Sequence, residues 1–175
     1  FQSYPPNEGS PALRGAICDW IARRYGVTLD PEQNVMALNG TREGLYNVAM
    51  ALCPEQKNGQ RPIVLCPNPF YQVYMVAAIS VGAEPHFVPA TAATGHLPDY
   101  ASLPAEVLNR TAVAYICSPA NPQGAVASRD YWAELIGLAE QYDFRIFADE
   151  CYSEIYRDAA PTGALTVARD MGAHP

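Results

Sequence analysis

Basic residues are scarce in this sequence: 11 lysines and arginines stand against 18 aspartates and glutamates, giving a formal net charge of −7. Binding a nucleic acid takes clustered Lys and Arg side chains that neutralise phosphates. Here these side chains are scattered, and the only adjacent pair, Arg23-Arg24, is typical of the solvated end of a helix. The charge distribution therefore disfavours a nucleic-acid partner.

Long apolar runs and paired cysteines are missing as well. No run approaches the roughly 20 residues that a membrane helix needs, and no signal peptide is visible, so we expect no membrane partner. The five cysteines are too far apart in sequence for a metal knuckle or a CxxC redox pair. We therefore expect reduced thiols, no metal site and a cytoplasmic protein.

The sequence also lacks GxGxxG, GxxxxGK[ST], GxSxG and HExxH, the motifs of dinucleotide sites, P-loops, serine hydrolases and zinc peptidases. Its three histidines, His86, His96 and His174, are not clustered, and we interpret each as structural or exposed. Function must therefore be inferred from less common patterns.

Apolar periodicity predicts alternating helices and strands after an extended arm rich in Pro, Asn and Gly at residues 1–10. A first helix carries Leu13, Ile17, Trp20 and Ile21 on one face and ends at Gly26. The pattern predicts further helices over 42–52, 71–81, 100–108 and 129–142, and strands over 62–66, 85–88, 112–117 and 144–148.

The predicted strands are apolar on both faces, which is typical of a parallel sheet covered by helices on both sides. We therefore expect an α/β fold with three layers and a mostly parallel sheet. Such sheets bind ligands at the carboxyl ends of their strands, so the residues that follow each strand are the candidates for function.

Two candidate segments offer phosphate and ring contacts. In Asn39–Leu45 a Gly-Thr pair opens a helix, with Thr41 expected as the N-cap, and free N–H groups at a helix start bind phosphate well. In Asn68–Tyr74 aromatic residues follow a strand and could stack on a flat ring. An ordinary capped helix and ordinary core aromatics remain open as alternatives.

Two further segments offer polar side chains. Ser118–Gly124 follows the strand over 112–117, and Asn121 within it either forms a turn or offers an amide to a ligand. Asp149 ends the last predicted strand, where a buried carboxylate is costly without a partner. A cationic partner, such as a protonated pyridine nitrogen, would explain its position.

In this order the four segments resemble the class I/II aminotransferases of fold type I, which use pyridoxal phosphate, and the resemblance covers nearly the whole chain. The early segment Tyr4–Arg14 is similar to the family's Tyr…Gly-x-Pro-x-Leu-Arg motif. Within the family, the run Leu38–Leu45 is most similar to bacterial succinyldiaminopimelate aminotransferases. The resemblance implies a partial large domain of the aspartate-aminotransferase type over 11–175.

The resemblance also implies a role for each candidate residue. Backbone N–H groups of Gly40, Thr41 and Arg42 would cradle the cofactor phosphate. Tyr71 would stack on the pyridine ring, and Asp149 would keep the ring nitrogen protonated.

The remaining implied roles concern the 3-oxygen of the ring and a second subunit. Asn121 and Tyr152 would hydrogen-bond the 3-oxygen, with a cis bond between Asn121 and Pro122. Tyr4, on the arm over 1–10, would reach across a homodimer interface to the partner's phosphate.

The family also needs a lysine that forms a Schiff base with the cofactor. The single lysine here, Lys57, lies in a polar loop that we expect to point away from the strand ends. We therefore assign no catalytic residue to this chain, expect the Schiff-base lysine beyond Pro175, and expect this stretch alone to be inactive.

The favoured hypothesis is a transaminase that moves an amino group between glutamate and a keto acid, such as N-succinyl-2-amino-6-ketopimelate in lysine biosynthesis. Three alternatives stay open. They are a pyridoxal-phosphate-dependent lyase of the same fold, an aminotransferase-like ligand sensor in a transcription regulator, and a cofactor-free structural domain.

Overall fold

The structure is a computed structural model that describes residues 4–173. Its contacts divide the chain into two compact units, Phe1–Gly44 and Leu45–Pro175, which we call the first and second unit. The expected arm over 1–10 at a dimer interface, with a large domain over 11–175, stays a prediction.

The first unit contains helix α1 (Pro11–Tyr25), as the sequence predicts. The Ser10 side chain accepts a hydrogen bond from the Leu13 N–H at 3.2 Å, which caps the first turn. Gly26 ends the helix at φ 68°, a left-handed conformation that costs little only for glycine.

The buried face of α1 differs from the expected one. Leu13 is 48% and Trp20 38% exposed, whereas Arg14 and Cys18 are buried. Arg14 explains the difference, because its guanidinium donates to the Pro31 carbonyl at 2.8 Å and to Glu32 at 3.0 Å. A charged side chain is tolerated inside when its donors find such partners.

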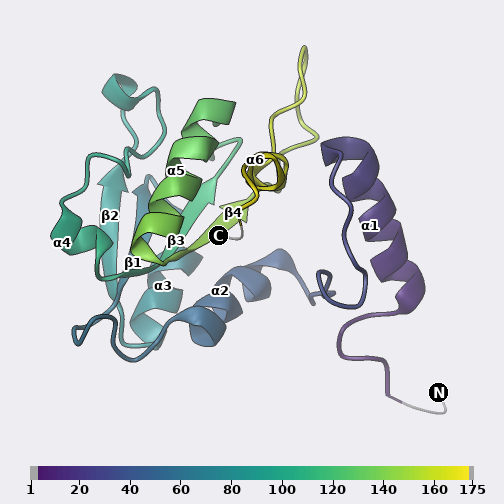
Figure 1. Cartoon of the computed structure of the whole chain (residues 1–175), viewed down its shortest axis with the longest axis horizontal. Helices are drawn as coiled ribbons and strands as arrows, with labels where there is room; N and C mark the ends of the chain where they lie inside the picture. Colours follow the sequence, from purple (N-terminus) through teal and green to yellow (C-terminus); the bar gives the residue numbers. More distant parts are fainter. Residues whose placement is uncertain (1–3, 174–175) are drawn as a thin grey trace. The chain divides into compact units, whose positions relative to one another are not determined.

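The second unit contains a four-stranded, fully parallel sheet with the order β2-β1-β3-β4 (Figure 1). The strands are β1 (Ile63–Asn68), β2 (Glu84–Pro89), β3 (Thr111–Cys117) and β4 (Arg145–Asp149), each within two residues of the predicted bounds. The parallel α/β prediction is therefore confirmed.

The predicted helices are present, with two corrections. The helices are α2 (Thr41–Leu52), which crosses the unit boundary, α3 (Gln72–Ser80), α4 (Ala105–Leu108), α5 (Arg129–Tyr142) and α6 (Ala164–Met171), with a 3-10 turn η1 (Ala92–Thr94). Helix α4 is shorter than the predicted 100–108, because Pro104 disfavours helical backbone at the residue before it. The sequence reading missed α6 and η1.

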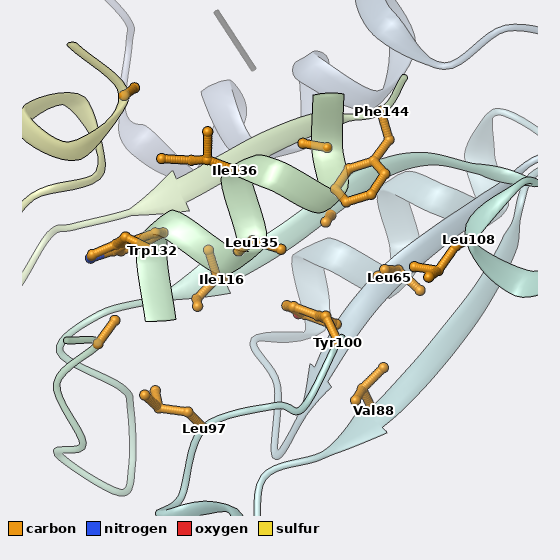
Figure 2. Close-up of a cluster of buried hydrophobic side chains, with 14 of the residues drawn as sticks. Leu65, Val88, Leu97, Tyr100, Leu108, Ile116, Trp132, Leu135, Ile136 and Phe144 are labelled. Atoms are coloured by element: carbon orange, nitrogen blue, oxygen red, sulfur yellow. The ribbon is translucent and has the colours of Figure 1, made fainter. Parts of the chain in front are cut away.

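Alternating strand residues build a separate core on each face of the sheet. Ile63, Leu65 and Ile116 belong to one buried cluster with Trp132, Leu135 and Ile136 of α5. Figure 2 shows most of these side chains together with Tyr100 and Phe144. On the other face, Val64, Cys66, Val113 and Tyr115 pack with residues of α2 and α3. The three-layer arrangement is thus confirmed, and it fixes the strand ends in place.

Two isoleucines on helices of the second unit test this burial. Ile136 of α5 is fully buried, whereas Ile79 of α3 is 56% exposed. We expect Ile136→Ala to lower the free energy of unfolding by about 2–5 kcal/mol, through lost apolar burial and a residual cavity. Ile79→Ala should change it by less than about 0.5 kcal/mol. Urea unfolding checks both values, and equal losses would contradict the layer assignment.

Candidate functional site

The carboxyl ends of the parallel strands lie at one edge of the sheet. Cys117, at the end of β3, is the register partner of Asp149, at the end of β4, and Asn68 pairs in the same way with Pro89. Because a parallel sheet aligns these ends, the segments that follow β1, β3 and β4 leave the sheet from this edge. Three of the four candidate segments predicted from the sequence follow these strands.

Asp149 is half-buried and accepts two hydrogen bonds. The Tyr74 hydroxyl donates to its Oδ2 at 2.8 Å, and the Cys151 N–H donates more weakly to Oδ1 at 3.4 Å. Within residues 4–173 no arginine, lysine or histidine forms an ion pair with this carboxylate. The carboxylate is therefore hydrogen-bonded but not neutralised by the part of the chain described.

Tyr74 is a site residue that the sequence analysis did not identify. It lies in the first turn of α3, three residues after the candidate Tyr71, and only 1% of it is exposed. Burial and the Asp149 charge raise the pKa of its hydroxyl well above the ordinary value. The sequence signal was the spacing Tyr71-x-x-Tyr74, which places both side chains near one face of a helix.

Aromatic contacts hold this part of the site. The Tyr71 and Tyr74 rings meet edge to face, with centroids 6.0 Å apart, and Tyr74 stacks on Tyr115 of β3 at 4.5 Å. The Tyr115 hydroxyl in turn donates to the Leu45 carbonyl. Tyr71 is half-buried, which leaves part of its surface available for a ligand ring.

Asn121 and Tyr152 come together although 31 residues separate them. The Asn121 amide donates to the Tyr152 hydroxyl at 3.2 Å, and the Asn121–Pro122 bond is cis, as expected. The neighbouring Cys151 raises the pKa of Tyr152, while the Asn121 amide lowers it. At neutral pH the phenol therefore keeps its proton and can donate it to an acceptor.

A cavity of about 530 Å³ adjoins this pair. Its wall includes both candidate side chains together with the apolar Val126 and Ile155 and the charged Arg157. Asp149 and Tyr71 are not part of this wall. A second cavity, of about 270 Å³, lies between residues 93–101 and α5, and no candidate residue lines it.

The segment that carries Tyr152 is fixed at both ends. The Glu150 carboxylate accepts a hydrogen bond from the Ala164 N–H at 3.0 Å, which satisfies a donor at the start of α6. The buried Trp132 indole donates to the Thr162 carbonyl at 3.0 Å. These contacts orient a loop that would otherwise be free to move.

Two thiols lie close to Asp149 but are not nucleophiles. Burial, with the Asp149 charge adding to it, raises the pKa of Cys117 to about 11 and that of Cys151 to about 12. Only the thiolate attacks an electrophile, so both side chains are inert at neutral pH. All five cysteines are free thiols, as expected.

The fourth candidate segment lies in the first unit and is described only within it. Helix α2 begins at Thr41, so Thr41 is its first residue rather than the expected N-cap. The Gly44 N–H already bonds to the Gly40 carbonyl, and Gly40 has φ 143°. A side chain there would need strained backbone and would approach Glu43 to 3.0 Å. Arg42 is exposed, and Tyr4 is 98% exposed.

Lys57 lies at the opposite edge of the sheet, as the sequence analysis expected. Its amine donates to the Tyr142 carbonyl at 2.9 Å and to the Asp143 carbonyl, at the end of α5 and just before β4 begins. Burial lowers its pKa. Its position gives it a structural role as a cap on the last carbonyls of α5.

Within the described residues no three His, Cys, Asp or Glu side chains gather as a metal site, and no helix there has the length and apolarity to cross a membrane. His86 lies in β2 and His96 in a turn, while His174 lies outside the described residues. The site is thus built from tyrosines, one asparagine and one carboxylate.

The sequence model for "Aminotransferase class I and II" matches residues 1–174. The LL-diaminopimelate aminotransferase of Desulforudis audaxviator (strain MP104C) is 41% identical over 172 residues, which cover 97% of this chain and 43% of that protein. That of Moorella thermoacetica (strain ATCC 39073 / JCM 9320) is 40% identical over 155 residues, or 89% of this chain and 38% of that protein. The chain thus spans about two fifths of the length of these relatives.

Solved structures agree on the fold. A crystal structure of an aminotransferase from Neisseria meningitidis Z2491 superposes with a TM-score of 0.90 at 38% identity, covering 98% of this chain and 44% of that one. These relatives and structures support the predicted family. The similarity to succinyldiaminopimelate aminotransferases expected from residues 38–45 finds no support among them.

A substitution at Lys57 separates a structural role from a catalytic one. We expect Lys57→Gln to lower the free energy of unfolding by about 1 kcal/mol, since two α5 carbonyls lose a charged donor. Its affinity for pyridoxal phosphate and for pyridoxamine 5′-phosphate should not change. Urea unfolding and fluorescence titration measure the two effects, with the exposed Glu55→Gln as the matched control. Lost ligand affinity at unchanged stability would contradict the structural role.

Proposed function

This chain belongs to the class I and II aminotransferase family, and we propose that it forms the cofactor-binding part of a pyridoxal-phosphate-dependent transaminase. The observation that carries the proposal is the position of Asp149. This half-buried carboxylate ends β4, has no ion-pair partner within residues 4–173, and lies at the same sheet edge as Asn121 and Tyr152. A protonated ring nitrogen supplies the missing cation.

The side chains at this edge of the sheet are chemically suited to pyridoxal phosphate. Its pyridine nitrogen requires an anion, its 3-oxygen requires hydrogen-bond donors, and its ring face requires an aromatic surface. Asp149 provides the anion, Asn121 and Tyr152 provide two donors 3.2 Å apart, and the half-buried Tyr71 provides the surface. The pKa of Tyr152 lies above the ordinary value, so its hydroxyl donates throughout the physiological pH range.

Within the first unit, Gly40, Thr41 and Arg42 stand at the beginning of α2, where the helix dipole and the backbone N–H groups of a first turn favour a phosphate. We assign the cofactor phosphate to this turn. Tyr4, whose side chain is almost fully exposed, is assigned to the phosphate of a partner subunit in a homodimer.

Bound pyridoxal phosphate would supply an electron sink and a carrier for the amino group. The residues of this chain bind and orient it. Asp149 holds a proton on the ring nitrogen, Asn121 and Tyr152 fix the 3-oxygen, and Tyr71 fixes the plane of the ring. The raised pKa values of Cys117 and Cys151 keep two nearby nucleophiles protonated, which protects a reactive carbonyl from them.

For the substrate of the whole protein we propose LL-diaminopimelate as the amino donor. The support is the name of the two relatives at 40% identity or more. The earlier proposal, transfer from glutamate to a succinylated keto acid, remains the second candidate, and both are amino-acid and keto-acid reactions. A lyase or a ligand sensor of this fold would bind the cofactor through the same residues, and its distinguishing residues would lie elsewhere in the protein.

Asp149→Ala tests the cofactor site and the cofactor-free alternative together. We expect the variant to bind pyridoxamine 5′-phosphate at least about tenfold more weakly, because a hydrogen bond to a charged group is lost. A cofactor-free domain would instead become more stable and show no change in ligand binding. Fluorescence titration and urea unfolding give both quantities. Glu140→Ala, an exposed carboxylate on α5, is the control and should leave both unchanged.

Borohydride reduction of the complete protein loaded with pyridoxal phosphate tests the assignment of the lysine. We expect peptide mapping to find one phosphopyridoxyl lysine after residue 175 and none at Lys57. An adduct on Lys57 alone, or no adduct and no cofactor absorbance, would overturn the proposed function. The loaded protein should then be assayed with LL-diaminopimelate and 2-oxoglutarate, and with glutamate and the succinylated keto acid. The faster pair identifies the substrate.

A further inference from the structure

We propose that Tyr74 is a positioning residue that fixes the orientation of the Asp149 carboxylate and presents it, fully charged, to the ring nitrogen of the cofactor. The inference rests on the proposed function, because it assigns Tyr74 to the same site. It starts from the 2.8 Å hydrogen bond from the Tyr74 hydroxyl to Asp149 Oδ2.

The donor, the Tyr74 hydroxyl, is held rigidly. Tyr74 is only 1% exposed, and its ring stacks on Tyr115 with centroids 4.5 Å apart and an angle of 11° between the planes. Tyr115 is itself fully buried and tied through its hydroxyl to the Leu45 carbonyl. The Tyr74 hydroxyl is therefore held by the sheet and two helices rather than by a loop.

The acceptor, the Asp149 carboxylate, is held at one of its two oxygens. Asp149 is the last residue of β4, and its other contacts among the described residues come from Cys151, whose N–H lies 3.4 Å from Oδ1 and whose thiol also interacts with the carboxylate. Without Tyr74 the carboxylate could rotate about its side-chain torsions. With Oδ2 fixed by a short bond, Oδ1 keeps one direction and has capacity for another strong donor. The ring N–H is such a donor.

The hydrogen-bond partner of Asp149 is uncharged. A lysine, arginine or protonated histidine at this position would neutralise Asp149 and compete with the pyridinium. A phenol donates a hydrogen bond and adds no charge. Burial and the Asp149 charge raise the pKa of Tyr74, so it remains a neutral donor at every physiological pH. The carboxylate keeps its whole charge for the ring nitrogen.

The test compares Tyr74→Phe with Tyr131→Phe in binding experiments. Tyr131 also has a partly buried hydroxyl, which donates to the Pro98 carbonyl at 2.6 Å, but it lies on α5 away from the candidate residues. The probes are pyridoxamine 5′-phosphate, which needs no lysine, and its 1-deaza analogue, in which carbon replaces the ring nitrogen.

We expect Tyr74→Phe to weaken binding of pyridoxamine 5′-phosphate by about 3- to 30-fold and to leave binding of the deaza analogue within about twofold. Tyr131→Phe should leave both affinities unchanged. An equal loss for both probes would assign Tyr74 a merely structural role and overturn the inference. Unchanged affinity of Tyr74→Phe would overturn it as well.

A ligand-free measurement tests the hydrogen bond itself. Above about pH 10 an unfolded tyrosine loses its proton, whereas folded Tyr74, whose pKa is raised, keeps it. Stability therefore falls as the pH rises, by up to about tenfold in the unfolding constant per pH unit for this residue. We expect Tyr74→Phe to lose this part of the decline. Asp149→Ala should reduce it in part, and an identical decline in Tyr74→Phe and the wild type would overturn the inference.

Comparing the wild-type protein with Tyr74→Phe distinguishes a failure of the proposed function from a failure of the role assigned to Tyr74. If the wild-type protein binds neither probe, the proposed function is overturned, and the role of Tyr74 toward the ring nitrogen falls with it. If the wild-type protein binds both probes and Tyr74→Phe binds them equally well, only the role of Tyr74 is overturned.

Discussion

Parallel alignment of the strands is the constraint on which the rest of this structure depends. It brings the ends of β1, β3 and β4 to one edge, although their sequences are far apart. Both faces of the sheet are covered by separate cores, so the strands cannot slide without exposing apolar side chains to water. The packing of the sheet therefore determines where the residues that follow the strands lie.

At that edge the Asp149 carboxylate has no counterion among the residues that the structure describes. Within residues 4–173 Asp149 accepts hydrogen bonds from neutral donors, and Asn121, which follows β3, pairs with Tyr152, which follows β4. Carboxylates in protein interiors are stable when hydrogen-bonded, and they bind a cation more strongly when none is already present. This arrangement is what makes the edge suitable for a protonated heterocycle.

Family membership and site geometry carry different parts of the conclusion. The match over residues 1–174 and the superposition on solved aminotransferases establish the family and the fold. The chain spans about two fifths of its relatives, so activity and substrate rest on proposals about the whole protein. The candidate site residues provide an anion, two adjacent donors, an aromatic surface and a helix start, each suited to a different part of one cofactor.

The sequence by itself determined most elements of the fold, because apolar periodicity and Gly or Pro boundaries are local signals; it predicted α4 with too long a range and missed the short elements η1 and α6. It also identified Asp149 and Asn121 as candidates, since strand ends can be located along the chain, whereas Tyr152 was implied by the family resemblance. Only the tertiary structure decided that Tyr74 contacts Asp149. That contact joins a helix to a strand 75 residues away, and no local pattern specifies which buried hydroxyl meets which carboxylate.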